Sequence, residues 1–145
     1  MNYRSLTDKD HEAIQVALWK AVAKAESKDW ISSVDLPTAY QEITSGKYIG
    51  LIVEETYLVM ADIVTPWYAA PDNKTLAELL VLRVYDGPGK FDSIPRVLQL
   101  LAETVGAGAI VVGTALTRTN RALQRMYARH GFQVSSVELF KNLKE

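Results

Sequence analysis

The stretch Thr119-Asn120-Arg121-Ala122-Leu123-Gln124-Arg125-Met126-Tyr127-Ala128-Arg129-His130-Gly131-Phe132 predicts one helix with a marked beginning and end. Asn120 suits the start of the helix, and Gly131-Phe132 suits its end. Seven positions at about 1.5 Å each place Tyr127 about 10.5 Å along the axis from Asn120. Seven rotations of about 100° also bring the two side chains to nearly the same side. A polar residue and a phenol therefore face one cleft, which makes this helix the best pointer to a site.

The segments around this helix predict buried strands. Ala109–Leu116 is an apolar run that suits a strand buried on both faces, and Gln133–Phe140 predicts a final strand. Thr75–Tyr85 is another nearly continuous apolar run with the same expectation. An amphipathic helix, with Ser93 as its expected cap and Gly106 at its end, lies between the two apolar runs. A buried strand, a glycine turn, a helix and a second buried strand make a crossover unit of parallel strands.

The N-terminal half begins with a strand and a helix. Asn2–Leu6 is a short strand candidate, and Thr7 with Asp10 forms a start that resembles a capping box. Apolar residues then recur at helical spacing as far as about Ala25.

Two strands joined by a tight connection follow a second short helix. Pro37 suits the start of that helix and Gly46 its end. Tyr48–Val53 and Tyr57–Val64 are the strands, and the residues Glu54-Glu55-Thr56 between them predict a hairpin. The whole order predicts a single α/β domain over residues 1–145, with a mixed, mostly antiparallel twisted sheet and helices on both faces.

Composition narrows the function classes. The chain has 145 residues, a formal net charge of −1, two histidines and no cysteine. Disulfides, thiolate metal sites and a cysteine nucleophile are therefore excluded, and we expect no catalytic metal. No stretch approaches the roughly 18 apolar residues of a membrane span. The N-terminus shows no signal peptide, so a cytoplasmic location without membrane partners is expected.

Both ends of the chain resemble the GCN5-related N-acetyltransferases, the GNAT superfamily. The family's last motif is an Asn, a small apolar residue, a Tyr and then Gly-Phe, as in residues 119–132. Tyr3-Arg4-Ser5-Leu6-Thr7-Asp8-Lys9-Asp10-His11-Glu12-Ala13-Ile14 resembles the family's first strand and its turn into the first helix. The resemblance covers essentially the whole chain. It implies transfer of an acyl group, most simply acetyl, from acetyl-CoA to a primary amine of a small molecule or protein.

The expected cofactor loop departs from the family pattern. The family carries Gln/Arg-x-x-Gly-x-Gly/Ala, whose amides hold the pyrophosphate, whereas this chain reads Tyr85-Asp86-Gly87-Pro88-Gly89-Lys90-Phe91-Asp92-Ser93. Pro88 has no N–H to donate. The resemblance assigns cofactor binding to a set of six residues. They are Leu82, Val84, Gly87, Gly89, Lys90 and Asn120.

Some of these assignments carry a specific expected role or an alternative interpretation. A backbone N–H near Val84 is expected to polarise the thioester oxygen. Gly87-Pro88-Gly89 is open to a second reading as a simple turn. Asn120 either bonds the pantetheine arm or only caps its helix.

Two residues are candidates for catalysis. Glu78 interrupts an apolar run, and the resemblance makes it the base that deprotonates the amine. Burial would raise its pKa into a useful range. The alternative is a carboxylate in solvent, or one paired with Arg83 or Lys74. Tyr127 resembles the family's tyrosine that protonates the departing thiolate, and the alternative is a core tyrosine.

Other features keep further functions open. Arg118, Arg121, Arg125 and Arg129 form a stripe that is either a solvated face or an anion-binding surface, although nucleic acid is an unlikely partner. Trp67 and Tyr68 line either a substrate pocket or the edge of a core. The altered loop also allows a catalytically inactive GNAT-like binding or structural protein, of the kind found as virion components. An edge strand could support a homodimer.

Overall fold

A five-stranded sheet organises the molecule. The computed structural model describes residues 2–25, 33–113, 120–135, 139 and 141–143. The strands are β1 (Tyr3–Ser5), β2 (Ile49–Val53), β3 (Tyr57–Val64), β4 (Thr75–Arg83) and β5 (Ala109–Val111). The helices are a 3₁₀ turn η1 (Asp8–Asp10), α1 (His11–Lys24), α2 (Leu36–Thr44), α3 (Ser93–Val105) and α4 (Asn120–Arg129). None of the helices among these residues is long and apolar enough to cross a membrane.

The sheet is mixed and mostly antiparallel, as the sequence predicts. Its strand order is β1-β2-β3-β4-β5, antiparallel from β1 to β4, with β5 parallel to β4. The expected hairpin joins β2 to β3, and Glu54 and Glu55 both have positive φ values, 53° and 47°. The amide of Thr56 bonds the carbonyl of Val53 at 3.0 Å, which closes a tight turn with these two residues at its centre, and Val53 pairs with Tyr57 across it. Carboxylate residues rarely adopt positive φ values, so contacts around the turn must hold them.

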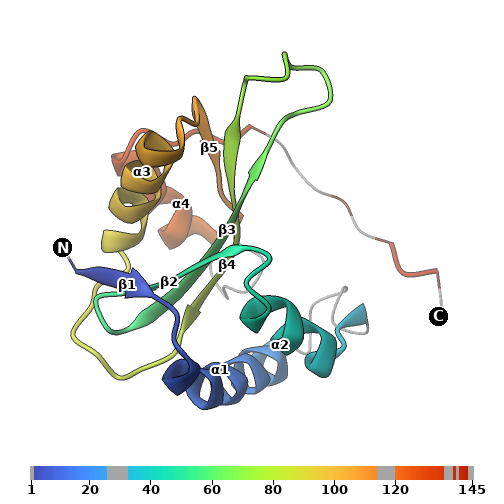
Figure 1. The fold of residues 1–145 in the computed structure, drawn as a ribbon, viewed down its shortest axis with the longest axis vertical. Coiled ribbons are helices and arrows are strands. Elements are labelled where there is room, and N and C mark those ends of the chain that lie inside the picture. Colours follow the sequence, from blue (N-terminus) through green and yellow to red (C-terminus); the bar gives the residue numbers. More distant parts are fainter. Residues whose placement is uncertain (1, 26–32, 114–119, 136–138, 140, 144–145) are drawn as a thin grey trace.

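Helices cover both faces of the sheet, which confirms the predicted layering. Figure 1 shows α3 and α4 on one side and α1 and α2 on the other. The α3/α4 face buries a core that includes Val59, Leu98 and Met126. The α1/α2 face buries a second core that includes Ile14 and Leu58. The apolar stripes read from the sequence are therefore the faces that pack on the sheet.

The two strands expected to be fully buried are less covered than predicted. In β4, the side chain of Leu79 is 45% exposed, and Arg83 at the strand end is exposed. In β5, Ala109 and Val111 are exposed. The prediction of complete burial was wrong for these residues because β5 is the outermost strand of the described sheet. The rest of the predicted strand, residues 114–116, lies outside the described residues.

Two further expectations need correction. Asp92, not Ser93, precedes the first turn of α3, and its backbone is already helical (φ −60°, ψ −18°), so no side chain caps the helix. The predicted strand Gln133–Phe140 is not formed in residues 133–135 and 139, the part of it that the structure describes. The exposed side chain of Val134 shows that these residues lack the sheet contacts a strand would need. The expected end of α3 is confirmed, since Gly106 takes a left-handed φ of 75°.

Candidate functional site

A bulge in β4 decides where Glu78 points. Met60 of β3 pairs with Leu80, but the next residue, Ala61, pairs with Glu78, so Leu79 is an extra residue without a register partner. An extra residue reverses the alternation of side chains along a strand. Leu80 packs with the α1/α2 core, whereas Ala61 belongs to the α3/α4 core. Glu78, opposite Ala61, therefore faces α3 and α4.

Glu78 is a half-buried carboxylate with one backbone donor. The amide of Gly113 donates a hydrogen bond of 3.0 Å to its Oε2. Burial raises the pKa of Glu78, and the Gly113 hydrogen bond opposes this only in part. The alternative ion pairs with Arg83 or Lys74 do not form among the described contacts. Arg83 instead reaches Tyr57 and the carbonyl of Gly87. Glu78 thus has the raised basicity expected of a general base.

Tyr127 is a buried tyrosine in an aromatic cluster. Its side chain is 4% exposed, and its ring meets Phe91 and Phe132 edge-on at centroid distances of 6.4 and 5.1 Å. Gly131 takes a φ of 88°, which turns the chain so that the Phe132 amide bonds the Tyr127 carbonyl. The Gly131-Phe132 pair therefore fixes the ring of Tyr127 as well as ending the helix. Among the described residues, no partner bonds the Tyr127 hydroxyl.

Glu78 and Tyr127 act on each other electrostatically. The pKa of Tyr127 is raised first by burial and then by the negative charge of Glu78. The phenol therefore stays protonated, while Glu78 titrates closer to neutral pH than a free carboxyl group. A base and an acid on one face of the sheet are the pair that an acyl transfer to an amine needs. The two residues predicted for catalysis therefore lie on the same face of the sheet, and their catalytic roles remain a prediction.

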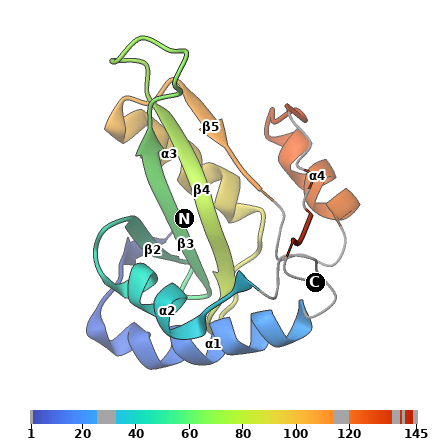
Figure 2. The same ribbon diagram turned by 90° about the vertical axis from the view of Figure 1, so that its right-hand side faces the viewer.

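Next to this pair, β4 has no pairing partner on the β5 side among the described residues. β5 pairs with β4 only from Thr75↔Ala109 to Ala77↔Val111, and the pairing stops one residue before Glu78. Figure 2 shows β5 turning away from β4 toward its end, with α4 on the side of β5. Among the described residues, the part of β4 from Glu78 onward has no strand on this side. An unpaired strand edge offers backbone donors and acceptors to a ligand.

The glycines of the loop after β4 pack against the β2–β3 turn. The amide of Gly89 donates a 3.0 Å hydrogen bond to the hydroxyl of the fully buried Thr56. A Cβ on Gly87 would lie 2.3 Å from that hydroxyl oxygen, and a Cβ on Gly89 would lie 2.7 Å from it. Only glycine permits such an approach. This packing explains both glycines without a phosphate, as the simple-turn reading expects.

The other expected cofactor residues differ in their availability. The amide of Val84 donates to the carbonyl of Thr56 at 2.9 Å, so it is engaged inside the protein. Leu82 is buried in the α1/α2 core, and Lys90 is exposed. Asn120 is the first residue of α4, as predicted.

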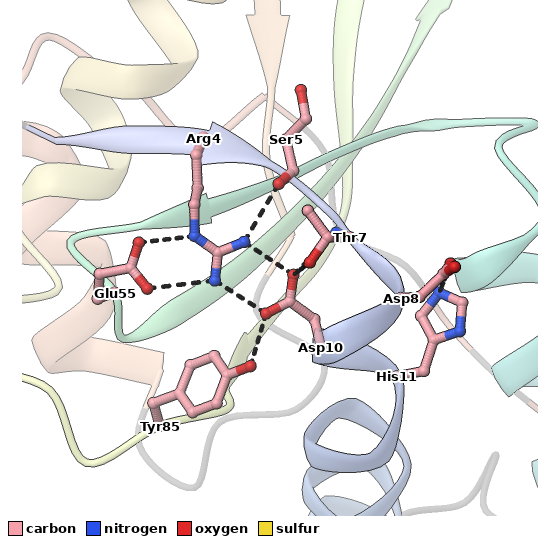
Figure 3. Close-up of polar contacts among 8 residues, drawn as sticks. All are labelled: Arg4, Ser5, Thr7, Asp8, Asp10, His11, Glu55 and Tyr85. Carbon is pink, nitrogen blue, oxygen red and sulfur yellow. Dashed lines mark hydrogen bonds and ion pairs between the residues drawn. The ribbon is translucent and has the colours of Figure 1, made fainter.

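A charged network behind the loop was not predicted. Figure 3 shows Arg4 between the carboxylates of Glu55 and Asp10, with the Tyr85 hydroxyl on Asp10. These four residues also line an open pocket of about 550 Å³. The capping pattern revealed the local role of Asp10, but no local signal links Arg4 to Glu55 or Tyr85, which lie 51 and 81 positions away.

The remaining candidates stay at the surface. Arg121, Arg125 and Arg129 are exposed, while Arg118 lies outside the described residues. Trp67 and Tyr68 are exposed at the tip of the β3–β4 connection and stack edge-on with each other, away from the two cores. No group of three or more side chains in the described part of the chain could hold a metal ion.

A further contact on this side of the sheet involves His130, which follows α4. It bonds Asp92 at 2.9 Å and so links the end of α4 to the start of α3. This contact lowers the pKa of Asp92.

Comparisons with known proteins identify the fold. No protein-family model matches the sequence, and no curated protein does either. A transcriptional regulator from Bacillus halodurans C-125 aligns with a TM-score of 0.70 at 17% identity, over 98% of this chain and 99% of that one. Glucosamine-6-phosphate N-acetyltransferase from Arabidopsis thaliana aligns with a TM-score of 0.64 at 12% identity, over 99% and 98%.

A third similar structure was solved with a ligand. It is AAC(6′)-Iy in complex with the bisubstrate analogue CoA-S-monomethyl-acetylneamine, with a TM-score of 0.64 at 12% identity over 99% and 97%. At these identities the similarity establishes the GNAT fold, as the sequence resemblance predicts. The activity has to be argued from the residues of the site.

Proposed function

We propose that this chain, which has the GNAT fold, is an N-acyltransferase that moves an acetyl group from acetyl-CoA to a primary amine. The observation that supports this most is the Glu78–Tyr127 pair beside the part of β4 that has no strand partner on the β5 side among the described residues. Burial makes the carboxyl a stronger base, and burial with the charge of Glu78 keeps the phenol protonated. The fold alone does not require a buried carboxyl group and a protonated buried phenol on one face of the sheet, because the same fold serves many activities.

The two side chains supply the proton transfers. Glu78, directly or through one water, accepts a proton from the substrate ammonium and so generates the nucleophilic amine. The amine nitrogen forms a bond to the acyl carbon, and the bond from that carbon to the CoA sulfur breaks. The Tyr127 hydroxyl donates its proton to the leaving sulfur, and the second proton that the nitrogen loses as the amide forms returns through water to the phenolate. Burial and the charge of Glu78 raise the pKa of this phenol, so it is protonated and present as a donor at neutral pH. The same shift makes it a weaker acid than the CoA thiol, so the proton passes to sulfur only as the carbon–sulfur bond breaks.

The backbone donor for the thioester oxygen is reassigned within β4. The amide of Val84 points to Thr56 and is engaged. Amides alternate in direction along a strand, so those of Val81 and Arg83 point to the β5 side of β4. We assign the polarising donor to one of these two amides in place of Val84. They lie on the same strand as Glu78 and next to the bulge.

The phosphates of the cofactor would be held by the parts of the loop that face outward. Gly89 is committed to Thr56. The amide of Gly87 has no acceptor among the described residues, and Lys90 is exposed at the approach to α3. An outward amide, a cation and the positive end of a helix together favour a phosphate. The cofactor therefore fits this loop with fewer amides than the family pattern provides.

The second candidate is a GNAT-shaped binding protein without catalysis. The inward amides of Gly89 and Val84 favour it, because they leave fewer donors for the cofactor. The two candidates differ in a direct way. Only the enzyme requires Tyr127 and Glu78 as titrating groups, whereas the binding protein requires them only as packed side chains.

A thiol-release assay tests the proposal. The chain has no cysteine, so a thiol reagent reports released CoA without a background from the protein. We expect release from acetyl-CoA to depend on an added primary amine and to fall in Tyr127→Phe and Glu78→Gln. Tyr68→Phe, at an exposed position, is the matched control and should retain full activity. Equal release with and without amines from a broad panel would favour the binding protein.

A further inference from the structure

We propose that Tyr85 is a positioning residue, whose hydroxyl ties the loop of residues 85–90 to the start of the first helix so that the loop is shaped before the cofactor arrives. The inference rests on the proposed function of this loop. The contact that carries it is a 2.5 Å hydrogen bond from the Tyr85 hydroxyl to Oδ1 of Asp10. It joins residues 75 positions apart in the chain.

Asp10 is a rigid anchor. Its side chain is 1% exposed, and it accepts two hydrogen bonds of 2.8 Å from the guanidinium of Arg4 and one of 2.9 Å from the amide of Thr7. Paired hydrogen bonds from a guanidinium fix a carboxylate in direction as well as in place. A phenol bonded to such a carboxylate is held in one orientation. Figure 3 shows Asp10 between Arg4 and Tyr85 in this arrangement.

The network continues to the β2–β3 turn. The guanidinium of Arg4 also donates to both carboxylate oxygens of Glu55, at 2.6 and 3.1 Å. Glu55 is one of the two turn residues with positive φ. The ion pair with Arg4 thus helps to hold a backbone conformation that a carboxylate residue seldom adopts.

The same turn holds the loop from its other side. The carbonyl of Thr56 accepts from the amides of Val84 and Tyr85, and the Thr56 hydroxyl accepts from the amide of Gly89. The loop is therefore fixed at both ends by Thr56 and at the Tyr85 side chain by Asp10. Between these points, the amide of Gly87 is left without an internal acceptor in the described part of the chain, as a phosphate site requires.

Removal of one hydroxyl separates positioning from folding. In Tyr85→Phe, Asp10 keeps its four hydrogen bonds, two from Arg4 and two from the amide and hydroxyl of Thr7, and the ring keeps its volume, so we expect the variant to fold. The loop loses only its side-chain tether. Amide exchange in the unliganded protein should then be faster at Tyr85 and Gly89, whose amides bond Thr56, than in wild type and unchanged in α2.

Two ligands, one with a diphosphate and one without, show which part of the cofactor depends on Tyr85. CoA carries the diphosphate that this loop would hold, and S-acetylpantetheine has the same reactive end without it. By calorimetry we expect Tyr85→Phe to weaken CoA binding about tenfold, or about 1.4 kcal/mol, and to leave S-acetylpantetheine binding unchanged. Tyr68→Phe, the same chemical change at an exposed site, should alter neither.

Failure of the role proposed for Tyr85 and failure of the proposed function give different experimental results. Unchanged CoA affinity and unchanged amide exchange in Tyr85→Phe, with normal CoA binding by the wild type, would overturn the role of Tyr85 alone. Equal weakening of both ligands would also overturn it, because a general loss of structure would explain the result. Failure of the wild-type protein to bind CoA would overturn the proposed function and this inference together.

Discussion

Glu78 on β4 and Tyr127 on α4 are coupled, because burial and then the negative charge of Glu78 raise the pKa of the Tyr127 phenol. The two residues are 49 positions apart in sequence, and the bulge at Leu79 turns Glu78 to the face where α4 packs. Without that extra residue, the alternation set by Leu80 and Leu82 would direct Glu78 toward α1 and α2. The bulge is therefore the backbone feature that assembles the candidate acid–base pair.

The first prediction concerns the dependence of turnover on pH. Glu78 must be ionised to accept a proton, and burial raises its pKa above the ordinary value of 4.5. We expect kcat/KM to rise with pH through an acidic limb that lies above pH 4.5. Glu78→Gln should lower turnover about 100-fold or more and remove this limb. An unchanged pH profile in the variant would exclude Glu78 as the base.

The stability of Glu78→Gln shows whether a loss of activity in this variant comes from the missing carboxylate or from unfolding. A carboxyl whose folded-state pKa is raised destabilises the folded protein when ionised, which is the case at pH values above its ordinary pKa. Replacement by a neutral amide should therefore leave the free energy of unfolding at pH 7 unchanged or higher. A chemical denaturation series at pH 7 checks this. A large loss of stability would mean that reduced activity reflects unfolding.

The second prediction separates the two roles of Tyr127. Tyr127→Phe keeps the ring contacts with Phe91 and Phe132 and removes only a hydroxyl that has no described partner. We expect a change in melting temperature of only a few degrees and a clear loss of turnover with acetyl-CoA. An acetyl thioester of an acidic aryl thiol needs no proton at sulfur, so its turnover should fall much less. Equal losses with both thioesters would contradict proton donation by Tyr127.

The third prediction concerns Gly89 in the loop after β4. In Gly89→Ala, the new Cβ would approach the Glu54 Cβ to 2.6 Å and the Thr56 hydroxyl to 2.7 Å. Overpacking of this kind typically costs about 1–3 kcal/mol in the free energy of unfolding. Gly108→Ala is the matched control, since a Cβ there meets nothing within 4 Å, and it should change stability by less than about 1 kcal/mol. Urea unfolding of the two variants measures the difference.

The fourth prediction concerns acid. Hydrogen bonds from Arg4 hold the pKa of Asp10 well below its ordinary value of 3.8. A lowered folded-state pKa contributes stability that is present above pH 3.8 and is lost as the pH falls below it. We expect the free energy of unfolding to fall steeply below about pH 4 in the wild type, and less steeply in Arg4→Met. The exposed Arg121→Met should keep the wild-type slope.

Local signals predicted most of the fold. The positions of β2, β3 and α2 follow from alternation, the hairpin and the Pro37–Gly46 boundaries. The ends of the sheet were harder, because apolar runs such as Ala109–Leu116 do not show which strand will lie at the edge. A continuous run means burial on both faces only where further structure covers it.

The sequence predicted which residues belong to the candidate site, but it did not predict how they are arranged in space. The sequence indicated Glu78 and Tyr127, but the bulge that brings them to one face leaves no mark in an apolar run. The engagement of the Val84 amide by Thr56 is likewise a backbone contact that no residue type encodes. The Arg4–Asp10–Tyr85 network depends on pairing across the fold, which a reading of local patterns does not supply.

The measurement that tests the central claim most directly is thermal unfolding with and without excess acetyl-CoA. A ligand that binds only the folded protein at 100 times its dissociation constant stabilises it by about 2.7 kcal/mol, which is a shift of a few degrees for a chain of this size. We expect such a shift in the wild type and in Tyr127→Phe, which loses a proton donor and keeps the cleft. No shift at millimolar acetyl-CoA would contradict the enzyme and leave a GNAT-shaped binding protein.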